Sequence, residues 1–301
     1  MKTLSKLTKR NMKMFFKDKG MFFVSLATPL ILLGLYIIFL GSMYTDSYLQ
    51  VIPENIVIDD KVIDGLVGSQ LFSSLLAVCT VTVAFCSNML MVNDKVSGAK
   101  NDLLIAPLKK SKIALSYYLA SFISTLLICL VSTLVCFVYL AIVGWYLSFV
   151  DIILIFFDVL LLVMFGTALS SVINHFLTSG GQISAVGSIV SAAYGFICGA
   201  YMPISSYGTA VQKVLSFLPS TYGTSLIRNH AMRGAFDEMV SQGVPTSVVE
   251  EIKSSIDCNI EFFGHSVSTG AMLGIMIASV IVLVGIYVLL NVLKHKKKVQ
   301  K

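Results

Sequence analysis

The stretch DIILIFFDVLLLVMFGTALSSVIN (residues 151–174) decides the fold class of this protein. It is apolar along almost its whole length, and a helix of roughly 20 apolar residues crosses the hydrocarbon core of a bilayer. Backbone groups in hydrocarbon must bond within the segment, so a span of this kind is a helix. The chain as a whole is 56% hydrophobic and 13% charged, whereas a soluble domain averages about 25% charged residues. The sequence therefore predicts an integral membrane protein.

Five more apolar runs extend the prediction to an all-α integral membrane protein with six transmembrane helices. Residues 1–20 are too polar to span, and we expect an interfacial amphipathic helix there. Residues 21–203 hold the first five spans with a cytoplasmic loop at 93–112, residues 204–267 form an outer loop, and residues 293–301 form a basic tail. The predicted spans are residues 21–42, 68–92, 113–143, 150–174, 181–203 and 268–292.

The distribution of lysine and arginine predicts the orientation. Residues 1–20, 93–112 and 293–301 carry seven, five and five basic residues, which is 17 of the 22 in the chain. Short loops rich in Lys and Arg stay on the cytoplasmic side, so both termini are expected in the cytoplasm. Because these basic residues lie beside the spans, the net charge of +6 indicates membrane lipids rather than nucleic acid as the charged partner.

The N-terminal segment MKTLSKLTKRNMKMFFKDKG predicts an amphipathic helix that lies in the membrane interface. At about 100° per residue, apolar side chains gather on one arc and basic side chains on the opposite arc, toward anionic lipid and the cytoplasm. Two interpretations remain open: a positively charged anchor, or a lever that lies along the membrane against a partner. The apolar arc is Leu4, Leu7, Met14 and Phe15, and the basic arc is Lys2, Lys6, Lys9, Arg10, Lys13 and Lys17.

Within residues 204–267 the sequence predicts a small helical outer subdomain. Between Pro203 and Pro219, apolar residues recur at helical spacing over a length too short to span, which is typical of a re-entrant or interfacial helix. The stretch VPTSVVEEIKSSI, which contains Pro245, has the pattern of a helix start with a capping box.

Asp158 is the one acidic residue well inside a predicted span. An ionisable residue in a membrane is a functional candidate, and a proton-coupled secondary transporter would need one. No Lys, Arg, His or Glu within the predicted spans accompanies Asp158, and the two halves of the chain show no convincing repeat. A structural Asp, held by neighbouring hydroxyl groups or protonated, is the competing interpretation.

The predicted fifth span is rich in small residues, which let helix backbones approach closely. Gly187, Ser191, Gly195 and Gly199 recur at every fourth position and would line one stripe of a helix. Pro29 predicts a kink or local unwinding in the first span. These residues are candidates for a translocation path or for a dimer seam. Packing within one chain is the alternative for the stripe.

The loop DKVSGAKNDLLIAPLKKSK joins the second and third predicted spans. Gly98 and Pro107 would bound a short helix, and Leu103, Leu104 and Ile105 form a compact apolar group within it. Such a group can fill an apolar groove on another protein, with lysines at the rim. A basic hairpin on lipid headgroups is the alternative, which would need the charge but not the apolar group.

Two stretches of the chain resemble type-2 ABC exporter permeases, the transmembrane subunits of ABC transporters in the drug, lipid and polysaccharide exporter class. GAKNDLLIAPLKKSKIALSYYLASF (residues 98–122) resembles the family's cytoplasmic loop, with its Gly, Leu-Leu pair and Pro. FICGAYMPISSYGTAVQKVLSFLPSTYGTSLIR (residues 196–228) resembles the end of its fifth span, with an aromatic-x-x-Gly, Pro-Ile and Pro-x-x-Tyr. The chain departs from the family pattern where Asp94 and Lys95 replace a usual Glu, and where a Pro after Pro-Ile is missing.

The resemblance implies that the loop is a coupling helix, which docks in a groove on a separate ATPase subunit present in two copies. ATP and Mg²⁺ would bind to that partner, because this sequence has no Walker-type GxxxxGK[ST] motif and is expected to be neither an enzyme nor a holder of cofactor or metal. A second permease half, identical or homologous, would complete the transporter. The coupling residues implied are Asp94, Gly98, Leu103, Leu104, Ile105, Pro107 and Lys109, and those of an outer re-entrant turn are Pro203, Ile204, Pro219 and Tyr222.

The function expected on these grounds is ATP-driven export of an amphiphilic drug, lipid or antimicrobial peptide. A composition with many lysines and few arginines favours the plasma membrane of a bacterium. An intramembrane enzyme would need a nucleophile–base pair or metal ligands within the spans, and the spans contain none. The main alternative is a proton-coupled secondary transporter that uses Asp158.

Overall fold

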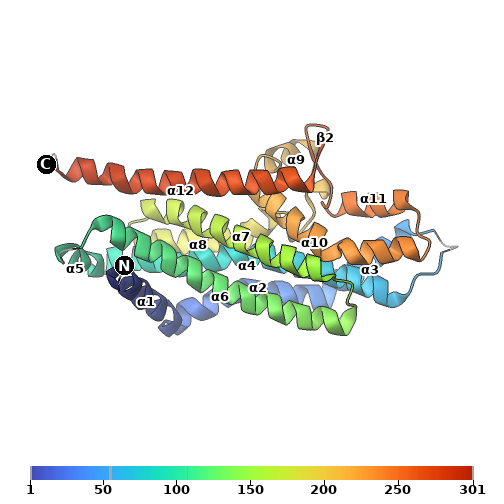
Figure 1. The fold of residues 1–301 in the computed structure, drawn as a ribbon, viewed down its shortest axis with the longest axis horizontal. Helices are drawn as coiled ribbons and strands as arrows, with labels where there is room; N and C mark the ends of the chain where they lie inside the picture. The colour runs from blue at the N-terminus through green and yellow to red at the C-terminus, as the bar shows by residue number, and fades with distance from the viewer. Residues whose placement is uncertain (1, 54–55, 107, 300–301) are drawn as a thin grey trace.

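The computed structural model describes residues 2–53, 56–106 and 108–299, and it is built almost entirely of helices (Figure 1). Within these described residues, five helices are long and apolar enough to cross a membrane. This confirms the all-α membrane fold class. The five are Lys19–Val51 (α2, Lys19–Leu35; η1, Tyr36–Leu40; α3, Gly41–Val51), α4 (Asp60–Val96), α6 (Lys110–Val143), α7 (Phe149–Phe176) and the Thr269–Asn291 part of α12 (Thr269–Val299).

Shorter elements complete the described part of the chain. They include one antiparallel hairpin, in which Ile260 pairs with Val267 and Phe262 with His265. The elements are α1 (Lys2–Lys17), α5 (Ala99–Ile105), α8 (Gly180–Ile197), η2 (Ile204–Ser206), α9 (Thr209–Leu215), α10 (Pro219–Ser241), α11 (Thr246–Ser255), β1 (Ile260–Phe262) and β2 (His265–Val267).

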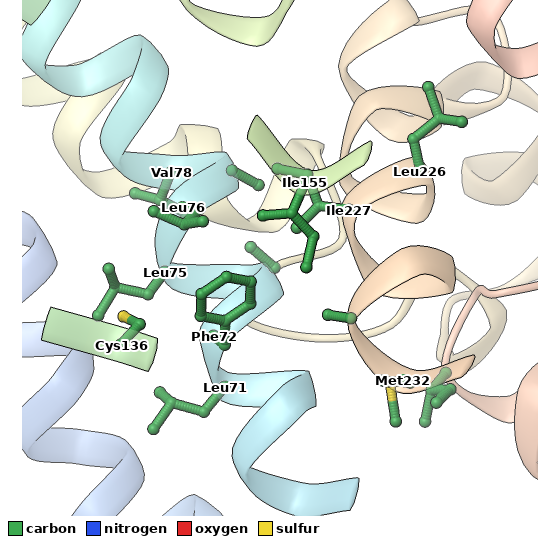
Figure 2. Close-up of a cluster of buried hydrophobic side chains, with 14 of the residues drawn as sticks. Leu71, Phe72, Leu75, Leu76, Val78, Cys136, Ile155, Leu226, Ile227 and Met232 are labelled. Atoms are coloured by element: carbon green, nitrogen blue, oxygen red, sulfur yellow. The ribbon is translucent and has the colours of Figure 1, made fainter. Parts of the chain in front are cut away.

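Helix α4 is the centre of the bundle. It is buried along most of its length and packs against α2, α6, α7, α8 and α10. Figure 2 shows the apolar part of this core, where Leu71, Phe72 and Leu75 of α4 lie beside side chains of α6, α7 and α10. Burial of this apolar surface among the helices gives the bundle a dense interior.

Polar side chains of α4 are hydrogen-bonded to neighbouring helices. Asn88 Nδ2 donates to the hydroxyl groups of Ser170 and Ser171 on α7, at 3.1 and 2.7 Å. The hydroxyl groups of Ser87 and Ser121, on α4 and α6, are 2.6 Å apart. Such contacts join transmembrane helices where lipid offers no hydrogen-bonding partner.

Gly166 allows α7 to lie directly against α4. A Cβ atom at this position would be 2.7 Å from the backbone oxygen of Thr80 and 3.1 Å from Cα of Val81. We expect Gly166→Ala to destabilise the protein by about 1–3 kcal/mol, because the backbones must separate. The thermal unfolding midpoint in detergent measures this. Gly285→Ala is the control, since a Cβ there meets no atom of the described residues within 4 Å. Equal midpoints for the two variants would contradict the prediction.

The first span differs from the prediction in two ways. Pro29 lies inside α2, which stays helical through it, and a π-helical turn that the sequence did not predict follows at Tyr36–Leu40. The helical segment does not end near residue 42 but continues to Val51. The prediction ended too early because the last turns contain many Tyr, Ser and Thr residues. Tyr44 and Tyr48 are nevertheless buried and stacked, with ring centroids 6.4 Å apart.

The predicted fifth span, 181–203, is helical only over Gly180–Ile197 and is not among the five long apolar helices. The helix ends because Gly199 adopts a left-handed conformation, with φ of 74°. The backbone N–H groups of Ala200 and Tyr201 then turn back and donate to the carbonyl of Gly195. The prediction that Gly195 and Gly199 lie on one helical stripe is therefore wrong.

Part of residues 204–267, for which the sequence predicts a small helical outer subdomain, lies within the helix bundle. Helix α10 packs against α4, α7 and α12, and fourteen of its residues are buried. The hydropathy pattern did not indicate this burial, because α10 contains many polar residues. The β1–β2 hairpin also lies in this region, and no pattern in the sequence predicted it. Helix α11 begins at Thr246, after Pro245 as expected, but without a side-chain cap.

The N-terminal helix α1, the short helix α5 and the C-terminal part of α12 lie at the same end of the elongated bundle (Figure 1). Helices α3 and α11 lie at the opposite end. The end that carries α5 is the one that the basic residues predict to be cytoplasmic.

Candidate coupling surface

A left-handed glycine sets the direction of α5. Helix α4 ends at Val96, and Gly98 has φ of 83°, a conformation that residues with a Cβ rarely adopt. The chain then forms the seven-residue helix α5 and reaches Lys109, which precedes α6. Pro107, predicted to end the short helix, lies outside the described residues. The two turns of α5 thus lie beyond the C-terminal end of α4 and the N-terminal end of α6.

The three apolar residues of α5 do not share one environment. Leu103 and Leu104 are half-buried and pack against a small core made of Leu90, Met91, Ile113 and Tyr117. Ile105 is 83% exposed. Leu103 and Leu104 therefore fix α5 to its own chain, and Ile105 is the apolar side chain offered outward.

Asp94 joins three helices beneath α5. It is 3% exposed, and its Oδ2 accepts hydrogen bonds from Arg10 of α1 at 2.7 Å and from Tyr117 of α6 at 2.5 Å. Partial burial lowers the pKa of Arg10, but the hydrogen bond and charge of Asp94 more than offset this and raise that pKa above its ordinary value. Asp94, which the sequence placed among the coupling residues, therefore acts within the chain and not on its surface.

Asp94→Asn is expected to loosen α1 from the bundle, because the charged partner of Arg10 is lost. A hydrogen bond to a charged group contributes about 1.5–3 kcal/mol, so amide exchange in α1 should increase by tenfold or more. Hydrogen–deuterium exchange of residues 2–17 measures this. Asp102→Asn is the matched control, because Asp102 is exposed on α5. Unchanged exchange in the Asp94 variant would show that α1 does not depend on this contact.

Helix α1 packs against its own chain. Asn11 Nδ2 donates to Ser116 of α6 at 3.3 Å, and Thr8, Asn11 and Phe15 are buried. Met14, assigned to the apolar arc, is 38% exposed, so the buried face differs from the arc predicted. The surface against which α1 lies is formed mainly by α6, with contributions from α2 and α4.

Lys95 connects the base of α5 to α7. Its ammonium group donates to the carbonyl oxygens of Asn174, His175 and Leu177, at 3.1, 3.0 and 3.3 Å. These carbonyls lie at the C-terminal end of α7, where a cation is favourable. The residues just before α5 are thus joined to α1, α6 and α7.

The predicted outer turn forms a compact corner. Pro203 precedes the short helix η2, and Ile204 is buried. Pro219 is the first residue of α10, and Tyr222 one turn later donates from its hydroxyl group to the carbonyl of Ser216 at 2.6 Å. The Pro-x-x-Tyr pattern therefore begins α10 and holds the end of α9 against it.

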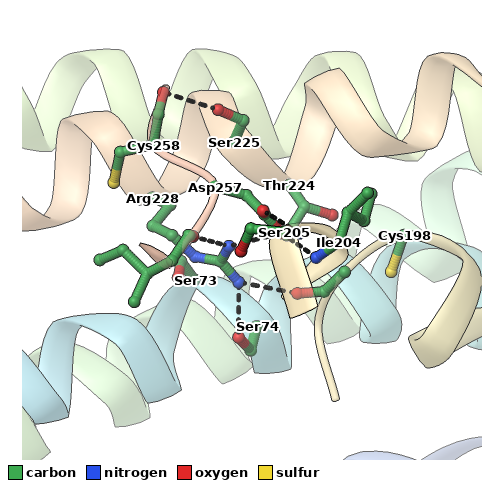
Figure 3. A network of polar contacts seen from close by, with 12 residues as sticks. Ser73, Ser74, Cys198, Ile204, Ser205, Thr224, Ser225, Arg228, Asp257 and Cys258 are labelled. Carbon is green, nitrogen blue, oxygen red and sulfur yellow. Dashed lines mark hydrogen bonds and ion pairs between the residues drawn. The ribbon is translucent and has the colours of Figure 1, made fainter. Parts of the chain in front are cut away.

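Arg228 organises the polar interior of this region (Figure 3). It is 1% exposed and donates to the carbonyl oxygens of Gly199, at 2.9 Å, and Ile256, and to Ser74 of α4. Asp257 lies 3.8 Å from the guanidinium group and accepts hydrogen bonds from two backbone N–H groups of η2. The carbonyl of Gly199 is thus a hydrogen-bond acceptor in this network. No local pattern in the sequence indicated that Arg228 is buried at its centre.

Asp158 has an ionisable partner that the sequence pattern did not indicate. Its Oδ2 lies 2.5 Å from Nδ1 of His230 on α10. One heptad earlier, Asp151 lies 2.5 Å from Arg233. The expectation that Asp158 stands alone was therefore wrong, because α10 was assigned to an outer loop. The two pairs join α10 to α7.

The stripe of small residues on α8 faces its own chain. A Cβ on Gly187 would be 2.7 Å from Met89 of α4, and one on Gly195 would meet the ring of Tyr201. Ser191 is half-buried. The exposed face of α8 is a different one, formed by Ala185, Ser188, Ile189, Ala192 and Phe196.

Residues 54–293 of the chain match one protein family, which is described as ABC-2 family transporter protein. The match begins before α4 and includes α5, α10 and most of α12, but not α1 to α3. A comparison with curated proteins found no significant match. Because the family match covers well over half of the chain and includes the candidate coupling surface, the chain belongs to the ABC-2 family of transporter proteins, as a transmembrane permease subunit of an ABC transporter.

Proposed function

We propose that this permease subunit exports an amphiphilic substrate from a bacterial cell, driven by a separate ATPase subunit that docks on α5. The observation that supports this most is the exposure of Ile105 on a helix whose base is held by polar contacts. An exposed aliphatic side chain between basic residues suits an apolar groove with an acidic rim. Two ATPase copies, with ATP and Mg²⁺ bound to them, would serve two permease halves.

The contacts of Asp94 and Lys95 suggest how α5 would transmit force. A displacement of α5 acts on α4 directly, on α1 and α6 through Asp94, and on α7 through Lys95. ATP can drive transport through these contacts only if ATPase closure favours one arrangement of the spans over another. In this proposal the cytoplasmic side of the membrane is the side of α5, and both termini lie there.

Co-purification in mild detergent from the native host tests the proposal, with no partner added. The expected result is an ATPase subunit in the purified sample and ATP hydrolysis that the permease subunit alone does not show. A well-folded permease that retains no ATPase would contradict the proposed partner. Accumulation of a cationic amphiphile in cells that lack the gene tests the substrate class, and strict dependence on a polar glycan would contradict it.

A second permease half would contact the exposed face of α8 in this proposal. Small side chains at Ala185, Ser188 and Ala192 allow close approach of another helix. We therefore expect Ala192→Cys to give a disulfide-linked dimer in oxidised membranes, since all six native cysteines are buried. Val131→Cys on the exposed face of α6 is the control. Cross-linking by both variants, or by neither, would contradict a seam between identical halves at α8.

A further inference from the structure

A groove of about 680 Å³ lies between the start of α6 and the C-terminal half of α12. Both of these segments lie at the α5 end of the bundle (Figure 1). Its walls are mostly apolar. The ring of Tyr118 stacks on that of Tyr287, with centroids 5.9 Å apart, and Tyr287 donates to the carbonyl of Ala114 at 3.2 Å. Leu115, Val284 and Val288 line the groove beyond these rings. The volume is in the range of ligand sites, roughly 300–1,000 Å³.

The rim of the groove is cationic. Lys109 and Lys110 line it, and both are exposed. Among the residues that the structure describes, neither ammonium group has an ion-pair partner, and none of the residues lining the groove is acidic. The first N–H groups of α6 lie at the same place and add a partial positive charge.

We propose that this groove binds an anionic phospholipid, with the headgroup phosphate at Lys109 and Lys110 and an acyl chain along Val284 and Val288. Both the positive charge of the rim and the position of the groove along the spans support a phospholipid as the occupant. A phosphate matches the two lysines, and an acyl chain matches an apolar groove that runs along two spans from their ends. Tyrosines near the ends of spans lie where headgroups meet acyl chains, which is the level that such a lipid requires.

A bound lipid at this site would affect the coupling surface. Lys109 directly follows the segment that contains α5, and Tyr287 fixes the first turns of α6 to α12. A lipid held by both helices would therefore stabilise the position at which α6 begins. The inference concerns lipid binding by this chain alone and does not depend on the ATPase partner.

Native mass spectrometry of the purified protein tests the inference, with phosphatidylglycerol and phosphatidylethanolamine as probes. We expect phosphatidylglycerol to be retained in preference, and Lys109→Gln with Lys110→Gln to reduce its occupancy by about tenfold, the effect of losing roughly 1.4 kcal/mol. Val288→Trp should reduce it equally while leaving both charges in place. Lys112→Gln is the matched control, because Lys112 is exposed in the same helical turn but does not line the groove.

Three outcomes would overturn the inference. If Lys112→Gln reduced phosphatidylglycerol occupancy as much as the Lys109 and Lys110 change does, the binding would be a general attraction of anions to a basic surface. Equal retention of the two phospholipids would show that the lysines do not select the headgroup. Displacement of the lipid by glycerol 3-phosphate at the same concentration would show a site for a free phosphate group, without a role for the acyl chain. Unchanged thermal midpoints establish that the variants are folded.

Discussion

Replacing Arg228 with Met is expected to lower the free energy of unfolding by about 3–5 kcal/mol, the usual cost of breaking a buried ion pair by removal of one partner. The guanidinium group is almost completely buried, and its N–H groups satisfy two carbonyl oxygens and the hydroxyl group of Ser74. Without it, Asp257 is a buried carboxylate that has no ion-pair partner among the residues that the structure describes. The thermal midpoint in detergent should fall by roughly 10 °C.

The dependence on pH provides a second measurement on the same variant. Burial raises the pKa of the Asp257 carboxyl, and the charge of Arg228 opposes this. Loss of Arg228 should raise that pKa further, so the folded variant binds the proton more tightly than the unfolded chain does. The stability that this carboxyl contributes to the variant is then fully present below the ordinary pKa of Asp, and it is lost as the pH rises through the raised pKa of the folded variant. The deficit relative to the wild type should therefore shrink in acid.

Two variants separate this network from general effects of charge. Lys253→Gln removes a cation from an exposed ion pair with Glu250, and it should change stability by no more than about 0.5 kcal/mol. Adding Asp257→Asn to the Arg228 variant should restore part of the loss, because the two residues are coupled. If the losses in unfolding free energy of the two single variants simply added in the double variant, Arg228 and Asp257 would not act as a pair.

Ile105→Asp is expected to abolish retention of the ATPase while leaving the fold intact. Ile105 is the exposed apolar residue of α5, and a carboxylate forced into an apolar groove would be desolvated without a partner. Loss of a central apolar anchor costs 2 kcal/mol or more, so affinity should fall by about thirtyfold or more. ATPase co-purified per permease, at an unchanged thermal midpoint, measures the effect.

Matched substitutions define the Ile105 test. Val57→Asp introduces the same charge at a residue that is 91% exposed between α3 and α4, at the opposite end of the bundle from α5, and it should leave the ATPase bound. Ile105→Leu should also retain it. Leu103→Asp and Leu104→Asp are less informative, because these residues pack against Leu90 and Tyr117 and their loss would also disturb the fold. Full ATPase retention by Ile105→Asp would exclude docking through α5.

Local hydrophobicity explains which parts of the fold could be predicted. Five of the six predicted spans are long apolar helices, since the transfer of a run of side chains into hydrocarbon depends on its own residues. The short helix α5 follows Gly98 for a similar reason, because a left-handed turn requires a local glycine. The sequence also located the short helix between Pro203 and Pro219 and the helix that follows Pro245, but it did not predict α10, which begins at Pro219.

The sequence by itself determined the class of the protein, the basic end of the bundle and the segment that projects from it, because each depends on residues that are neighbours in the chain. Only the tertiary structure decided which of Leu103, Leu104 and Ile105 faces outward, since residues far along the chain cover the first two. It alone paired Asp158 with His230 and Arg228 with Asp257. Hydropathy treats α10 as a polar loop, yet Ser225, Arg228 and His230 lie within the bundle because each meets a partner from a distant segment. No local pattern encodes such a partner.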